Sequence, residues 1–342
     1  ARELCPEAIV IRGNSATYSK FSEMVTDIIK EDVPLFEKSS VDEFYLDLTG
    51  MDRFFGCHQF ATELRQKVIK ESGLPISFGL SVNKTVSKVA TGEAKPNNQI
   101  RVDFGREKGF LAPLSIRKIP MVGAKTYQTL RNLGVKYVRT VQEMPVDALQ
   151  QVMGKNGMLL WKKSNGIDNA PVLPYSERKS ISTERTFERD TIDVNRLKSL
   201  LVAMTENLAF QLRRGKKLTA CITLKVRYSD FNTHTLQARI PYTSADHVLI
   251  PKALELFQRL YQKRLLVRLV GVRFSHLVSG GYQINLFEDS EEMINLYQAM
   301  DYLRERYGDR AVIRAAGKEA KTIGRNNPFD GSAPLLLANR KA

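Results

Sequence analysis

Two hydrophobic periods alternate along the first third of the chain. Apolar residues at helical spacing mark two amphipathic segments, and every-other-residue spacing between and after them marks strands. In order, the pattern predicts a helix at 17–32, a hairpin at 35–49, a helix at 54–69, a strand at 76–82 and a short helix at 84–92. This alternation predicts an α+β domain over 15–102, and residues 1–14 are expected to form a helix end followed by a strand.

The pattern changes after residue 102. Short helices with short loops are predicted over 103–172, and the polar, proline-containing stretch that follows predicts an interdomain linker at 173–177. Beyond it the pattern predicts an opening strand from 178, a helix at 192–213, strands at 218–229 and 234–242, a helix at 245–262 and a strand at 266–276. A further amphipathic helix is predicted at 290–308, followed by a poorly ordered basic tail at 317–342. The chain is therefore expected to be an α+β multidomain protein.

Charge is distributed unevenly between the predicted domains. The 342 residues carry 52 Lys and Arg against 37 Asp and Glu, a net charge of +15, which indicates a polyanionic partner. Residues 178–279 hold 19 basic and 8 acidic residues, a net charge of +11, whereas residues 15–102 hold 11 and 12, a net charge of −1. An ordinary solvated surface does not explain this asymmetry, so residues 178–279 are predicted to form the domain that binds the polyanion.

The cysteine and histidine usage bears on compartment and metal chemistry. Cys5, Cys57 and Cys221 are scattered and odd in number, which indicates reduced thiols in a cytosolic protein. The sequence has no C-x-x-C, and its four histidines lie far apart, which argues against a zinc site. No signal peptide or apolar run of membrane-spanning length is present, so a cytoplasmic, nucleoid-associated protein without a membrane partner is expected.

Three acids cluster in the predicted hairpin. Glu43 and Asp47 share one strand face with Tyr45, and Asp42 can turn toward that face from the preceding residue. The other face is apolar, with Phe44, Leu46 and Leu48. Gathering three acids costs free energy unless a cation or a basic group offsets their repulsion. On pattern alone, a metal site and a solvated strand that bears acids remain equally good interpretations.

Several motifs resemble those of Y-family (translesion) DNA polymerases, especially the bacterial DNA polymerase IV branch. They are Ser-Val-Asp-Glu with Tyr-Leu-Asp at 40–47, Gly-Leu-Ser-Val-Asn-Lys-Thr-Val-Ser-Lys at 79–88, and Ala-Lys-Pro-Asn at 94–97. The resemblance implies a ferredoxin-like palm that is incomplete here, a helical helix-hairpin-helix thumb, and a βαββαβ little finger. The implied parts are a fingers–palm junction at 1–14, the palm with its catalytic acids at 15–102, the thumb at 103–172, the little finger at 178–279, and a clamp-binding motif with a tail at 280–342.

The resemblance also implies a metal site and a nucleotide site. In that family the Asp and Glu of the first motif help to bind two Mg²⁺ ions at the primer 3′ end and the incoming nucleotide, and they correspond to Asp42 and Glu43. Lys95 corresponds to the lysine that meets the triphosphate, where an ammonium group serves as a point charge. A strand with the first catalytic Asp, an aromatic gate against ribose and most of the fingers would lie upstream of Ala1. This leaves open whether the chain as given is active alone.

Two regions of the predicted palm and thumb are expected to contact DNA. Lys84 and Lys88 are four residues apart and so lie on one helix face. The stretch 119–125 resembles a helix-hairpin-helix, in which backbone N–H groups at a helix start hold a phosphate, and this predicts contacts at Gly123 and Lys125. Met121 stands where the motif usually has its first glycine. A second hairpin is predicted at 153–157.

The predicted little finger carries basic residues at mostly alternating strand positions, which can form one sheet face along duplex phosphates. They include Lys179, Arg185, Lys225, Arg227, Arg239 and Arg273. Beyond the little finger, Gln283, Leu286 and Phe287 resemble the pentapeptide that bacterial replication proteins dock into the sliding clamp. The alternative is that the apolar residues of this segment pack on the little finger.

The leading interpretation is a monomeric, template-directed translesion DNA polymerase without proofreading. Its partners would be primer-template DNA, deoxynucleoside triphosphates and the sliding clamp. The first rival is a non-catalytic DNA-binding, clamp-docking protein that retains the fold. The second is a nucleotide cyclase, which can share the palm, although the thumb-like hairpins and the basic domain argue against it.

Overall fold

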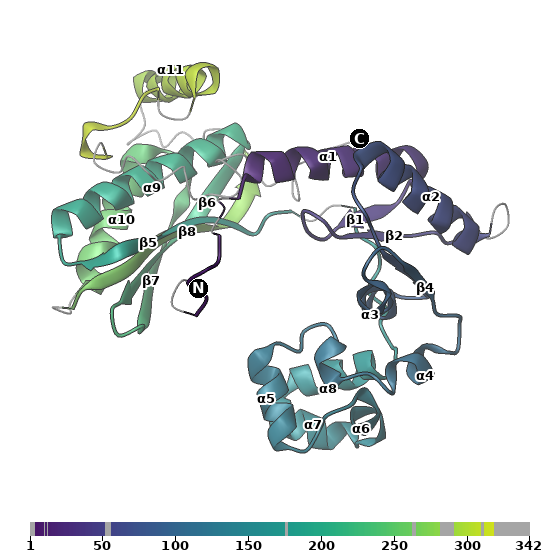
Figure 1. Cartoon of the computed structure of the whole chain (residues 1–342). Coiled ribbons are helices and arrows are strands. Elements are labelled where there is room, and N and C mark those ends of the chain that lie inside the picture. The colour runs from purple at the N-terminus through teal and green to yellow at the C-terminus, as the bar shows by residue number, and fades with distance from the viewer. Residues whose placement is uncertain are drawn as a thin grey trace. The chain divides into compact units, whose positions relative to one another are not determined.

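The fold was analysed in a computed structural model that describes residues 4–9, 11, 13–51, 56–174, 177–261, 265–280, 291–308 and 311–317. Its contacts divide the chain into two units. One is Tyr18–Tyr175, and the other combines Ala1–Thr17 with Ser176–Ala342. Figure 1 labels their helices and strands. No helix within these described stretches has both the length and the apolar character needed to cross a membrane.

The first half of the Tyr18–Tyr175 unit forms the predicted α+β palm. Its elements are α1 (Ser15–Asp32), β1 (Phe36–Lys38), β2 (Phe44–Leu46), α2 (Cys57–Ser72), β3 (Phe78–Leu80), α3 (Lys84–Ala94) and β4 (Gln99–Arg101). β1 and β2 pair antiparallel as a hairpin, and β3 pairs parallel with β4. Gly73 ends α2 in the left-handed conformation, with its N–H on the Ile69 carbonyl, as glycine at this position commonly does.

The apolar face of the acid-bearing strand packs as its alternation predicts. Phe44, Leu46 and Leu48 lie against a core made by α1 and α2, in which Ile28, Ile29, Val33, Leu64 and Val68 are buried. The opposite face of the hairpin is therefore left for polar residues. Two further contacts hold the hairpin to α1. The Ser22 hydroxyl donates to the Val41 carbonyl at 2.5 Å, and the Lys38 ammonium donates to the Thr26 hydroxyl at 2.7 Å.

The second half of this unit is helical, as predicted. Its elements are α4 (Glu107–Leu111), the 3₁₀ turn η2 (Ile116–Lys118), α5 (Ala124–Asn132), α6 (Val138–Glu143), α7 (Val146–Met153) and α8 (Lys155–Ser164). One apolar core joins these helices to the palm, because Val86, Val89 and Ala90 of α3 are buried in the same cluster as Leu130 and Leu160. Helix α3 thus belongs to both halves of the unit.

The other unit contains a four-stranded antiparallel sheet. Its elements are β5 (Ser180–Thr191), α9 (Val194–Arg214), β6 (Lys217–Tyr228), β7 (Thr233–Thr243), α10 (Asp246–Leu260) and β8 (Val267–Ser279), and the spatial strand order is β5-β8-β6-β7. The predicted β-α-β-β-α-β order is therefore confirmed. Both helices cover the same face of the sheet (Figure 1), where Leu224, Val226, Val270 and Phe274 form the core with Leu201.

Helix α11 (Glu291–Tyr307) and the short turn η3 (Ala315–Gly317) follow, and buried charges hold them to α9 and α10. The Arg213 guanidinium donates to Asp301 at 2.6 Å and to Asp246 at 2.8 Å. Arg304, whose side chain is 2% exposed, donates to Glu206 at 2.6 Å. These paired charges thus connect α11 to α9 and α10 within the second unit.

The described residues of 1–14 show neither the predicted helix end nor the predicted strand. The described residues of this segment form a turn, in which the Ala8 N–H donates to the Cys5 carbonyl at 3.2 Å, and they form neither helix nor strand. Ile9 and Ile11, the apolar residues of the expected strand, are 89% and 84% exposed. A strand of two or three residues cannot persist without a partner for its backbone groups. The predicted tail beyond Gly317 lies outside the described residues.

Candidate active site

Asp42 and Glu43 lie at the solvent-facing start of β2. The hairpin turn closes through the Glu43 carbonyl, which accepts the Ser39 N–H at 2.9 Å and the Ser40 N–H at 3.3 Å. Asp42 is exposed and accepts a 2.6 Å hydrogen bond from the Ser40 hydroxyl. Both carboxylates are therefore accessible, and the backbone that carries them is fixed by the turn.

Glu43 has a cationic partner on helix α3. The Lys88 ammonium lies 2.7 Å from Glu43 Oε2, and both side chains are more than a third exposed. Lys88, predicted as a DNA contact, thus meets the predicted metal ligand directly. A cation that offsets the repulsion between adjacent acids is what a cluster of this kind requires.

Asp47, the third acid of the hairpin, serves the local backbone. Its Oδ1 accepts the Thr49 N–H at 2.9 Å. The hydrogen bond of the Thr49 side chain, and then this backbone hydrogen bond, lower the pKa of Asp47. Across the described residues, no three His, Cys, Asp or Glu side chains come together in a way that could hold a metal ion. The predicted metal ligands are thus the two exposed carboxylates Asp42 and Glu43, without a third described acid beside them.

The polar face of the hairpin holds a second cluster that the sequence did not reveal. The Lys84 ammonium lies 2.6 Å from Glu37 Oε2 and 5.1 Å from the centre of the Tyr45 ring. Tyr45 stands opposite Glu37 in the β1–β2 register. Burial, and then the negative charges of Glu43, Glu37 and Asp168, raise the pKa of Tyr45 to about 12. Lys84 was predicted as a DNA contact, but in this structure its ammonium is engaged within the palm.

Only one signal in the sequence could have pointed to this second cluster. Glu37 lies six residues before Glu43, in the strand that precedes the hairpin turn, and a correct register would have put it on the polar face. Asp168 lies in a loop after α8, and no local pattern connects a loop residue to the palm. The contact that brings it to Thr85, at 2.5 Å, is a product of the tertiary fold.

Lys95 lies immediately after helix α3 and before Pro96. A palm arginine holds this turn: Arg65 of α2 donates to the Asn97 carbonyl at 2.8 Å and to the Asn97 side chain at 2.5 Å. Its Nε also donates to the Ile76 carbonyl at 2.9 Å. The backbone beside Lys95 is thus fixed at the end of α3.

The first predicted hairpin has an unusual backbone at Met121. The turn leads from η2 into α5, whose N-cap residue Gly123 provides no side-chain cap, so the first backbone N–H groups of α5 remain available. Met121 has φ of 80°, a value that favours glycine. The glycine usual at this point of the motif is thus explained by backbone geometry, and methionine adopts the same turn at a cost. The second predicted hairpin joins α7 to α8 through Gly154, whose φ is 60°.

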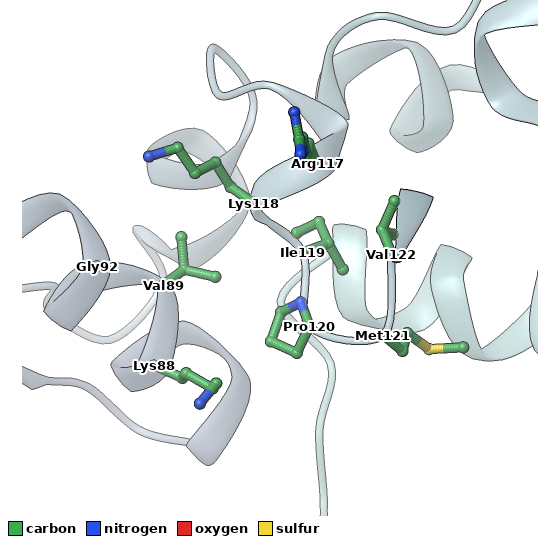
Figure 2. A pocket seen from close by; sticks show the side chains of 10 residues that line it. Lys88, Val89, Gly92, Arg117, Lys118, Ile119, Pro120, Met121 and Val122 are labelled. Atoms are coloured by element: carbon green, nitrogen blue, oxygen red, sulfur yellow. The ribbon is translucent and has the colours of Figure 1, made fainter. Parts of the chain in front are cut away.

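A pocket of about 530 Å³ lies between α3 and this first hairpin. Figure 2 shows Lys88 and Val89 on the α3 side, with Pro120 facing them from the hairpin. The lining also includes Arg117, and the pocket borders Gly123 at the start of α5. Lys88 therefore connects the acid pair of the palm with the predicted phosphate-binding turn of the thumb.

In the four-stranded sheet, the register sorts the predicted basic residues by face. Cross-strand pairing puts Lys225, Arg227, Arg239 and Arg273 on the face opposite the helices, because their neighbours Ile222, Leu224, Val226, Val272 and Phe274 point into the core. Arg185 is the exception. Its register partner is Val270, so it lies on the helix-covered side of the edge strand β5. The neighbouring residue of β5, Glu184, lies on the open face and forms an ion pair with Lys225.

The remaining predicted sites divide between exposed positions and positions outside the described chain. Lys125 is exposed on the first turn of α5, and Lys179 is exposed just before β5. Gln283, Leu286 and Phe287, predicted to bind the clamp, lie outside the described residues. The three cysteines carry free thiols, as predicted, with Cys5 exposed and Cys221 buried.

Comparisons with known proteins agree with this architecture. Residues 1–92 match the impB/mucB/samB family, residues 178–286 match the impB/mucB/samB family C-terminal domain, and residues 117–168 match the DNA polymerase-iota thumb domain. The DNA polymerase IV of Dehalococcoides mccartyi is 35% identical, over 91% of this chain and 81% of the relative. That of Desulfatibacillum aliphaticivorans is 32% identical, over 92% of this chain and 82% of the relative.

Solved structures share the fold. A chimera of the Y-family DNA polymerases Dbh and Dpo4 superposes with a TM-score of 0.68 at 22% identity, covering 82% of this chain and 81% of the other. DinB from Sulfolobus solfataricus gives a TM-score of 0.52 at 21% identity, covering 82% of both chains. The shared fold, the matched families and the DNA polymerase IV relatives together define a polymerase with palm, thumb and little finger. The chain belongs to the Y-family DNA polymerases, in the DNA polymerase IV branch.

Proposed function

We propose that this chain, a DNA-directed DNA polymerase of the translesion class by its family, joins deoxynucleotides to a primer 3′-OH with Asp42 and Glu43 as metal ligands. The observation that carries the proposal is the exposed pair of adjacent carboxylates on a backbone fixed by the hairpin turn. Mg²⁺ in polymerase sites is held by one or two carboxylates together with substrate phosphates, so this donor set fits the ion.

Two Mg²⁺ ions, when bound, would supply a lowered pKa for the primer hydroxyl and neutralise charge on the triphosphate. The protein's own residues prepare that chemistry. Lys88 neutralises Glu43 in the structure, at 2.7 Å, and Glu43 would exchange this partner when a divalent cation binds. Lys95, on its fixed turn, is proposed to meet outer triphosphate oxygens as a mobile point charge.

The metal-ligand assignment is tested by replacing each carboxylate with its amide. Asp42→Asn and Glu43→Gln should each lower single-turnover nucleotide insertion by at least about 100-fold, since they remove a charge that stabilises the transition state. Glu71→Gln, an exposed acid at the end of α2, is the matched control. DNA affinity should stay within about twofold in all three, because phosphate contacts come from basic residues elsewhere. Normal insertion by both site variants would remove Asp42 and Glu43 from the mechanism.

We propose that the open face of the four-stranded sheet binds duplex DNA through phosphates. This face carries Thr, Ser and Gln residues and four cations, of which Lys225 is paired with Glu184, and it supports a sequence-independent contact. The double variant Arg239→Ala, Arg273→Ala should reduce the slope of log K against log salt by about 2, since each phosphate contact contributes roughly 0.9. Arg259→Ala, an exposed arginine of α10 on the helix side, should leave the slope unchanged. Equal slopes in the double variant and the wild type would refute the contact.

Two finer parts of the proposal concern fidelity and tethering. The chain is proposed to extend mismatched primers without excising them, which a primer-length assay on a 3′-mismatched end would test. Gln283, Leu286 and Phe287 are proposed to dock into the sliding clamp, with the two apolar side chains as anchors. Leu286→Ala with Phe287→Ala should abolish stimulation by the clamp at an unchanged melting temperature. A lowered melting temperature with intact stimulation would show that the segment is core packing instead.

A further inference from the structure

The stretch that follows the last thumb helix is bound to the palm at successive points. The Asn83 side-chain amide donates to the Gly166 carbonyl at 2.8 Å, and the Thr85 hydroxyl donates to Asp168 at 2.5 Å. Lys163 of α8 reinforces the second contact, with its ammonium 2.6 Å from the Thr85 hydroxyl and 3.3 Å from Asp168. The start of α3 therefore holds the chain as it leaves the thumb.

Two charged residues of the palm bind the same stretch of chain further along, at residues 171 and 173. The Lys84 ammonium donates to the Pro171 carbonyl at 3.0 Å, and Glu37 Oε2 accepts the Leu173 N–H at 2.8 Å. Lys84 and Glu37 also pair with each other at 2.6 Å, and their side chains are only 18% and 23% exposed. One carboxylate oxygen thus receives both the ammonium and the backbone amide.

This arrangement joins three parts of the molecule that are distant in sequence. Glu37 lies in β1, beside β2, which Glu43 immediately precedes, and Lys84 is the first residue of the helix that carries Lys88. Pro171 and Leu173 belong to the segment that leads to β5. A partly buried ion pair whose members each hold one backbone group is stronger than an exposed pair, because water screens it less.

We infer that Glu37 and Lys84 are positioning residues for the little finger. Together they form a linker anchor: they hold residues 171–173 on the palm and fix the point from which the chain departs toward Ser180. Without these contacts the last palm contact would be that of Asp168. Glu177 is already bound to Lys217 of β6 at 3.0 Å, so the connecting chain would lengthen from residues 174–176 to residues 169–176. The effective concentration of a tethered module falls roughly as the −3/2 power of the tether length, which here is about fourfold.

The inference rests on the proposed function to the extent that the two units engage one DNA molecule. The linker anchor itself does not depend on the proposed function, because its contacts are made without DNA. The test therefore has two measurements. The first is amide hydrogen exchange at Leu173 in the free full chain, and the second is the affinity of the same protein for a primer-template duplex.

Three variants separate the contributions. Glu37→Ala removes both the ion pair and the acceptor of the Leu173 N–H, whereas Glu37→Gln keeps an acceptor and loses the pair. Lys84→Met removes the Pro171 contact and leaves Glu37 in place. Glu31→Ala is the matched control, because Glu31 also pairs with a lysine, Lys67, at 2.9 Å in the same unit, but away from the linker.

Glu37→Ala should speed Leu173 exchange by about tenfold, the effect of losing one hydrogen bond, and Glu37→Gln should speed it less. The double variant Glu37→Ala, Lys84→Met, which removes both backbone contacts, should weaken duplex binding by about fourfold relative to Glu31→Ala, and each single variant should weaken it less. Unchanged Leu173 exchange in a folded Glu37→Ala protein would show that Glu37 does not hold the linker, and it would overturn the linker anchor. Faster exchange with unchanged affinity in the double variant would overturn the positioning role. A failure of nucleotide insertion would bear on the proposed function alone, since neither measurement uses it.

Discussion

Gly79 in β3 is the position where a single methyl group should do the most to disturb the palm. A Cβ added there would lie 2.4 Å from the Ser87 carbonyl oxygen, 2.6 Å from the Ala90 Cβ and 2.6 Å from the Thr91 nitrogen. All three atoms belong to α3, and two of them are backbone atoms. No rotation of a flexible side chain can therefore relieve the overlap, and the helix must move away from the strand.

The size of the effect follows from these distances. The closest contact is about 1 Å shorter than ordinary van der Waals contact, so α3 must shift by a similar amount. Overpacking of this kind costs about 1–3 kcal/mol of the free energy of unfolding. Because α3 carries Lys88 and leads into Lys95, a shift of about 1 Å should also lower nucleotide insertion by up to roughly 100-fold.

The assay compares Gly79→Ala with two other glycine-to-alanine changes. Gly92 lies within the same helix with nothing within 4 Å of the added Cβ, so Gly92→Ala should stabilise the protein by up to about 1 kcal/mol through helix propensity. Gly109 of α4 is equally open, and Gly109→Ala serves as the control for insertion rate. Urea denaturation and single-turnover insertion give both quantities. A Gly79→Ala protein as stable and as active as Gly109→Ala would refute the close packing of β3 on α3.

Three further changes test other parts of the structure. Met121→Gly should raise the free energy of unfolding by about 1 kcal/mol, measured by urea denaturation, because glycine adopts a φ of 80° without strain; a loss of stability would contradict this backbone reading. Arg304→Met should lower the free energy of unfolding by about 3–5 kcal/mol, because it leaves buried Glu206 without its main partner, and the exposed neighbour Arg306→Met should be nearly neutral in the same melts. The raised pKa of Tyr45, about 12 against an ordinary 10, means that the folded protein keeps this proton where the unfolded chain loses it. The stabilising contribution is therefore complete below pH 10 and is lost as the pH rises toward 12, so stability should fall more steeply over this range in the wild type than in Tyr45→Phe; parallel curves would contradict the buried environment of Tyr45.

The sequence by itself determined the elements and their order. Alternation at 43–48 assigned Phe44, Leu46 and Leu48 to the core, and the structure packs them there because side chains of a strand must alternate between its faces. The strands and helices of 178–279 were also predicted within a few residues, since long periodic segments carry a strong local signal. The acid pair and the lysines of α3 came from motifs, which are local in the same sense.

Only the tertiary structure decided which of these residues meet. Strand register put Arg185 on the opposite face from Arg239 and Arg273, and a shift of one residue, which the sequence does not fix at an edge strand, would have reversed that result. The partners of Glu37 lie 47 and 136 residues further along the chain, at Lys84 and Leu173. No periodicity links residues so far apart. They meet because α3 is buried in the core shared with the thumb, which brings the chain leaving α8 back across the palm.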